Sequence, residues 1–271
     1  MLRQRDRLVL LLGSNGVAAW RRASISSSWE PIVSCSRNNS RSDALTAAPR
    51  GTIGALEELV AQLDGVSRPE IQVVLASALC PGLVVRLGEE PLTRTVRERL
   101  ALHRLQQAFG IAPPQWTVEM DARSVTGATL AFAVETELLA RITRTLAHRS
   151  PRTLSIVPTV AWAVDLLDER FEGWIVIDGA EEATVARCAK SEVDVLENIS
   201  RLASIHDAAR HVAASGVRHG IVEPGVSLTL ISPGGRLGPG VHQVGAHEVH
   251  VIDPFGDDQP TAATAPRALA A

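Results

Sequence analysis

RLVLLLGSNGVAAWRR, residues 7–22, and WIVIDGAEEATVARCAK, residues 174–190, repeat one pattern at two distant places in the chain. Each stretch is an apolar strand, a tight polar turn and a second apolar strand, which is the pattern of a β-hairpin. Both turns open on a glycine followed by a small residue, Gly13-Ser14 and Gly179-Ala180. Two halves that each open with such a hairpin predict a duplicated α/β architecture with a cleft between the halves.

Length and composition exclude several classes of protein. A chain of 271 residues with 45% hydrophobic content can form one large domain or two lobes of about 100–130 residues each. The net charge of −3 and the absence of tyrosine give no support for general nucleic-acid binding. The odd number of widely spaced cysteines fits a reducing compartment and no disulfide framework.

Apolar periodicity predicts the order of elements along the chain. Strands are expected at 8–12, 17–21, 31–34, 71–76, 83–87, 116–120, 129–134, 153–157, 226–231 and 249–252. Helices are expected at 52–63, 92–109, 135–147, 159–167 and 199–214. One side of the second of these helices is predicted to be lined by Val96, Leu100, either His103 or Leu102, Leu105 and Phe109.

The same reading divides the chain into a first lobe, residues 1–172, a second lobe, residues 173–253, and a disordered tail, residues 254–271. Residues 36–50 are expected to form a polar loop, and the region after residue 199 looks short for a full second half. The apolar run at 8–12 is too short for the core of a signal peptide, and no run of 18 apolar residues exists. We therefore expect a cytoplasmic protein.

No nucleotide-binding or hydrolase signature is present. The glycine-rich segment 234–240 follows a strand but no helical pattern follows it, so we interpret it as a flexible loop. His247 and His250 point to opposite faces of a strand, which argues against a metal site. His206, Asp207 and His211 are interpreted as surface polar residues of a helix.

Asp178, at the end of a strand beside Gly179, is the most interesting carboxylate. Two interpretations of it stay open. It could hold metal-bound water or a phosphate, or it could hydrogen-bond its own turn, and the second interpretation is favoured.

From residue 8 to residue 190 the chain resembles the actin-like superfamily, and within it the bacterial assembly-platform branch that contains PilM and the cytoplasmic domain of GspL. The first hairpin is similar to the family's opening Asp-x-Gly-Ser-x-x-x-Lys phosphate turn. The segments that carry the rest of the resemblance are VVLASAL (73–79), QWTVEMD (115–121), LAFAVETELLARITRTL (130–146), LSIVPTVAWAVDLL (154–167) and the second hairpin. The resemblance implies an α/β, two-lobed actin-like fold.

The departures from the family pattern concern its charged residues. Leu11 stands where the first turn has its aspartate, Ala18 stands where that turn has its basic residue, and Asp178 is displaced by one position from Ile177. A shift of one residue on a strand sends the side chain to the other face. Without two correctly aimed carboxylates, Mg²⁺–nucleotide is poorly held.

The resemblance therefore implies a cofactor-free protein without catalytic or metal-binding residues. If ATP with Mg²⁺ binds at all, the cofactor contacts are expected to be Gly13, Ser14, Asp178 and Gly179.

Three functional hypotheses follow. The first is a non-catalytic cytoplasmic scaffold at the inner membrane, which links a short peptide of a membrane-platform protein to the motor ATPase of a type IV pilus or type II secretion system. The scaffold would reach the membrane only through that partner. The second is a working ATP-binding enzyme or nucleotide switch of the same superfamily. The third is an unrelated α/β interaction protein.

Overall fold

The computed structural model describes residues 6–23, 28–36, 48–63, 69–111, 114–121, 127–147, 154–167, 171–179, 181–189, 192–221 and 227–256. The chain divides into two compact units. The first unit contains Met1–Pro81, Leu105–Val118 and Phe132–Thr159, and the second contains Gly82–Arg104, Glu119–Ala131 and Val160–Ala271.

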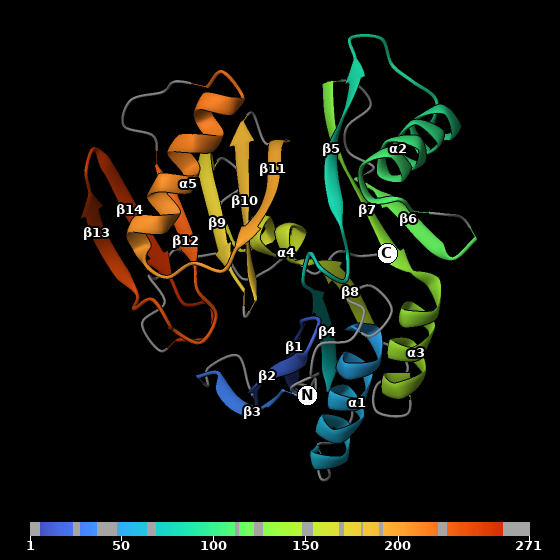
Figure 1. The fold of residues 1–271 in the computed structure, drawn as a ribbon. Coiled ribbons are helices and arrows are strands. Elements are labelled where there is room, and N and C mark those ends of the chain that lie inside the picture. Colours follow the sequence, from blue (N-terminus) through green and yellow to red (C-terminus); the bar gives the residue numbers. More distant parts are fainter. Residues whose placement is uncertain are drawn as a thin grey trace, which may run out of the picture. The chain divides into compact units, whose positions relative to one another are not determined.

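The first unit is built on a five-stranded sheet with the order β3-β2-β1-β4-β8. Its strands are β1 (Arg7–Leu12), β2 (Gly16–Arg22), β3 (Glu30–Ser36), β4 (Glu70–Leu75) and β8 (Leu154–Pro158). β1 pairs antiparallel with β2 and parallel with β4, which in turn pairs parallel with β8. Helices α1 (Ala48–Gln62) and α3 (Thr136–Ala147) lie side by side in this unit (Figure 1), α1 against β2 and β3 and α3 against β8.

The leucine run of residues 8–12 is explained by the central place of β1, between β2 and β4. Leu8, Leu10 and Leu12 are at most 1% exposed, and Val9, which points to the other face, is 5% exposed. A strand that is covered on both faces is continuously apolar rather than alternating. This confirms the prediction that residues 8–12 form a buried first strand.

A smaller, three-stranded sheet has the order β5-β7-β6, formed by β5 (Gly82–Gly88), β7 (Gly127–Glu135) and β6 (Trp116–Met120). Helix α2 (Arg94–Phe109) connects β5 to β6 in the chain and ends before Gly110, whose φ is +67°. Glycine adopts this left-handed conformation readily, so it ends the helix as predicted.

The second unit contains a six-stranded sheet with the order β11-β10-β9-β12-β14-β13. Its strands are β9 (Gly173–Asp178), β10 (Glu182–Ala189), β11 (Glu192–Ser200), β12 (Leu228–Ile231), β13 (Gly240–Val244) and β14 (His247–Ile252). Helix α5 (Ile205–Arg218) packs across one face, in contact with β9, β12, β13 and β14 (Figure 1). β11 and β13, which the periodicity did not predict, add a strand at each edge of this sheet.

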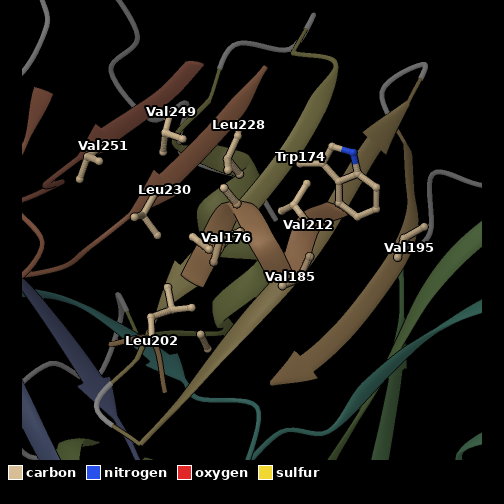
Figure 2. Close-up of a cluster of buried hydrophobic side chains, with 13 residues drawn as sticks. Trp174, Val176, Val185, Val195, Leu202, Val212, Leu228, Leu230, Val249 and Val251 are labelled. Carbon is tan, nitrogen blue, oxygen red and sulfur yellow. The ribbon is translucent and has the colours of Figure 1, made fainter. Parts of the chain in front are cut away.

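Beneath α5, alternate residues of the inner strands β9, β10, β12 and β14 join one hydrophobic core. The core contains Trp174 and Val176 of β9, Leu228 and Leu230 of β12, and Val212 of α5 (Figure 2). The intervening residues of β9, Ile175 and Ile177, are also buried, so that strand is covered on both faces. Short helix α4 (Thr159–Asp165) belongs mostly to this unit, and its Trp162 stacks on Phe255 with ring centroids 5.9 Å apart.

The predicted helix at 199–214 was wrong at its start. β11 continues to Ser200, and α5 begins only at Ile205. A capping box sets this boundary: the Ser204 hydroxyl accepts from the Asp207 backbone N–H, and the Asp207 carboxylate accepts from the Ser204 backbone N–H. Asp207, interpreted from the sequence as a plain surface residue, therefore has a structural role.

Two other helices differ from their predictions. α1 begins at Ala48 instead of Thr52, with Pro49 in its first turn, where proline leaves no extra N–H unsatisfied. In α2 the buried side is formed by Ala101 and Leu105, while Val96 and Phe109, predicted to face inward, are 46% and 43% exposed. Only a narrow stripe of α2 is buried, and apolar residues outside that stripe stay in contact with solvent.

β11 is tied to the end of α5 by the Glu197 carboxylate. It accepts hydrogen bonds from Arg218 and pairs with His219 at 2.9 Å. Burial alone would raise the pKa of Glu197, but the hydrogen bonds from Arg218 and His219 outweigh it and hold the pKa below the usual 4.5. A cationic side chain at a helix C-terminus also interacts favourably with the helix dipole.

Some predictions concern residues that the structure describes only in part. Of the predicted loop at 36–50, residues 37–47 lie outside the described residues. Of the predicted tail, only Pro254, Phe255 and Gly256 are described, and Phe255 is buried. Among the described residues, we find no helix both long and apolar enough to cross a membrane.

Candidate functional site

The two hairpin turns singled out from the sequence close with the same backbone hydrogen bond. In the first turn (residues 13–16) the Gly13 N–H donates to the Gly16 carbonyl at 2.9 Å. In the second turn (residues 179–182) the Gly179 N–H donates to the Glu182 carbonyl at 3.0 Å. The flanking pairs, Leu12 with Val17 and Asp178 with Ala183, also correspond. The repeat is therefore structural, and Asp178 corresponds to Leu12 of the first hairpin.

In the first unit, Thr52 of α1 holds the first turn. Its hydroxyl oxygen lies 2.6 Å from the Gly13 carbonyl and 2.9 Å from the Ser14 carbonyl, and the side chain is fully buried. Thr52 was predicted to mark the start of the helix. It instead lies inside α1 and anchors the helix to the turn, a role that requires contact between residues 39 apart in sequence.

In the second unit, Asp178 points to the face of the sheet that α5 covers. It lies two residues after Val176 and four after Trp174, which belong to the core under α5, and every second residue of a strand points to the same face. Its side chain is only 3% exposed. Both carboxylate oxygens bind the Arg236 guanidinium, Nε to Oδ2 at 2.8 Å and Nη2 to Oδ1 at 2.5 Å. The Ser232 hydroxyl lies 3.4 Å from Oδ2. This is a bidentate, charge-assisted pair.

The favoured interpretation of Asp178, that it hydrogen-bonds its own turn, was wrong. Its partners lie 54 and 58 residues further along the chain. They reach it because β12 runs parallel to β9 with Ile231 beside Ile177, which places Ser232 next to Asp178. The ends of neighbouring parallel strands meet at one edge of a sheet, and this rule was the available signal for finding Ser232 and Arg236.

Arg236 is aimed at Asp178 by the glycine-rich loop, residues 234–240. Two consecutive turns shape the loop, closed by bonds from the Gly235 N–H to the Ser232 carbonyl and from the Gly238 N–H to the Gly235 carbonyl, each 3.0 Å long. Gly235 has φ +66°, a conformation that favours glycine. Nη2 of Arg236 also donates to the Leu202 carbonyl at 2.9 Å. One guanidinium thus joins β9, the glycine-rich loop and the segment before α5.

The remaining candidates are possible metal ligands, thiols and histidines. Among the described residues, no group of three or more His, Cys, Asp or Glu side chains could hold a metal ion. Burial raises the pKa of the Cys80 thiol to about 12 and that of Cys188 to about 11, so neither forms the reactive thiolate at neutral pH. His250 pairs with the neighbouring Glu248 at 2.6 Å.

A pocket of about 600 Å³ lies within the second unit, next to Arg236 of the Asp178–Arg236 ion pair. It is bounded by residues 203–206 at the start of α5, by Arg236 and Leu237, and by Val241–Val244 of β13. The four predicted cofactor contacts fall in different units: Gly13 and Ser14 in the first, Asp178 and Gly179 in the second. The structure brings each pair together in its own turn.

Neither a protein-family model nor a curated protein sequence matches this chain. Solved structures do match it. A Bacteroides thetaiotaomicron protein with an actin-like ATPase fold and unknown function aligns at TM-score 0.55 and 9% identity, over 85% of this chain and 82% of that one. The chain has an actin-like fold.

Two further similar structures come from a type II secretion system and from type IV pilus biogenesis. The cytoplasmic domain of EpsL, an inner membrane component of the type II secretion system of Vibrio cholerae, aligns at TM-score 0.53 and 13% identity, over 91% of this chain and 90% of that one. The PilM–PilN type IV pilus biogenesis complex aligns at TM-score 0.53 and 13% identity, over 85% of this chain and 82% of that one. The predicted fold class is confirmed.

The two turn glycines give a matched test of the actin-like hairpins. A Cβ at Gly179 would lie 2.4 Å from the Glu182 carbonyl oxygen, whereas a Cβ at Gly13 would lie 3.8 Å from that of Gly16. We expect Gly179→Ala to lower the free energy of unfolding by about 1–3 kcal/mol, because backbone must shift. Gly13→Ala should change it by less than about 0.5 kcal/mol. Urea denaturation measures both changes. Equal effects of the two substitutions would contradict the conclusion that only Gly179 lacks room for a side chain.

The Asp178–Arg236 pair predicts a second series. Arg236→Leu leaves a carboxylate with a 3% exposed side chain unpaired, and should lower the free energy of unfolding by about 3–5 kcal/mol. The double variant Asp178→Asn/Arg236→Leu should recover a large part of that loss, because no charge remains buried.

The control for this series is Arg94→Leu, which removes an ion pair to Glu98 that is 85% exposed on the arginine side. Because exposed ion pairs contribute little to stability, this variant should lower the free energy of unfolding far less than Arg236→Leu does. Urea denaturation of the four proteins is the measurement. A double variant no more stable than Arg236→Leu alone would show that the pair does not hold this end of the sheet.

Proposed function

We propose that this protein is a non-catalytic scaffold of an inner-membrane assembly platform, of the kind that serves a type IV pilus or a type II secretion system. The main support for the proposal is that both carboxylate oxygens of Asp178 already bind Arg236 and are therefore not free to bind a metal ion. The actin-like neighbours include EpsL, an inner membrane component of a secretion system, and PilM in a pilus biogenesis complex with PilN.

The chemistry of the turns supports a role without nucleotide turnover. Mg²⁺ takes oxygen ligands, and phosphoryl transfer depends on the metal and on cationic side chains that neutralise the developing charge. Asp178 already carries a guanidinium at 2.5 Å, and a second cation would have to displace it. The corresponding residue of the first hairpin is Leu12, which is buried and cannot ligate a metal. An actin-like body that does not hydrolyse ATP is then free to act as a docking surface.

The proposed scaffold joins two partners. One is a membrane-platform protein that contributes a short peptide on its cytoplasmic side, and the other is the motor ATPase of the same machine. The protein is placed at the inner membrane through the first partner. It needs no cofactor for this role.

Binding of nucleotide is the most direct test against an ATP-driven enzyme or switch. We expect about 5 mM Mg-ATP to leave the melting temperature of the protein unchanged within about 1 °C. Binding would be detected readily, because a ligand at 100 times its Kd stabilises the fold by about 2.7 kcal/mol. Asp178→Asn, which keeps the size of the side chain and removes its charge, is the matched variant. A clear stabilisation of the parent protein that this variant loses would favour the nucleotide switch.

Partner identity is tested by purification of the tagged full chain from its native host after chemical cross-linking, followed by mass spectrometry. We expect a membrane-anchored component of a pilus or secretion platform among the cross-linked proteins. Arg236→Leu, which disturbs the second unit, should reduce its recovery, while the surface control Arg94→Leu should not. Recovery of no such component would contradict the proposal.

A further inference from the structure

We draw no further inference here: the strongest candidate, the pocket of about 600 Å³ between the start of α5 and the edge strand β13, carries none, because Arg236 in its lining already binds both oxygens of Asp178 and nothing in the described part of the chain shows what covers the open edge of the strand.

Discussion

The second half of this protein depends on one buried ion pair, Asp178 with Arg236. A carboxylate with a 3% exposed side chain is stable in a protein interior only when its charge is paired and its oxygens are hydrogen-bonded. Arg236 meets both needs with a two-pronged contact. Nη2 of the same guanidinium also donates to the Leu202 carbonyl, so Arg236 positions the chain before α5 as well. The glycine-rich loop has to fold into two turns for this guanidinium to arrive.

This pair also connects the fold to the proposed function. Both hairpin turns close with the same backbone hydrogen bond. The residues that precede the two turns differ, since Leu12 of the first hairpin corresponds to Asp178 of the second, which is paired with Arg236. In the role that we propose, this charged residue serves internal cohesion and not the binding of a nucleotide.

Much of the fold followed from local patterns. The two hairpins, β4, β5, β6, β7, β8 and α3 lie where apolar spacing predicted them, since each buries a regular face or a continuous run. β11 was missed because its residues alternate only weakly and a helical pattern follows closely. The inner side of α2 was misjudged because the stripe that a helix buries depends on what packs against it, which Val96 and Phe109 could not reveal.

The sequence by itself determined the repeated hairpins, most of the order of elements and the candidate residues Gly13, Ser14, Asp178 and Gly179, because turn chemistry and periodicity act over short distances. Only the tertiary structure decided what those residues do. Asp178 finds Arg236 58 residues away, and Thr52 finds the carbonyls of the first turn. Such partners are set by the register of parallel strands and by the packing of helices on them. Contacts of that range have no local signature in a chain.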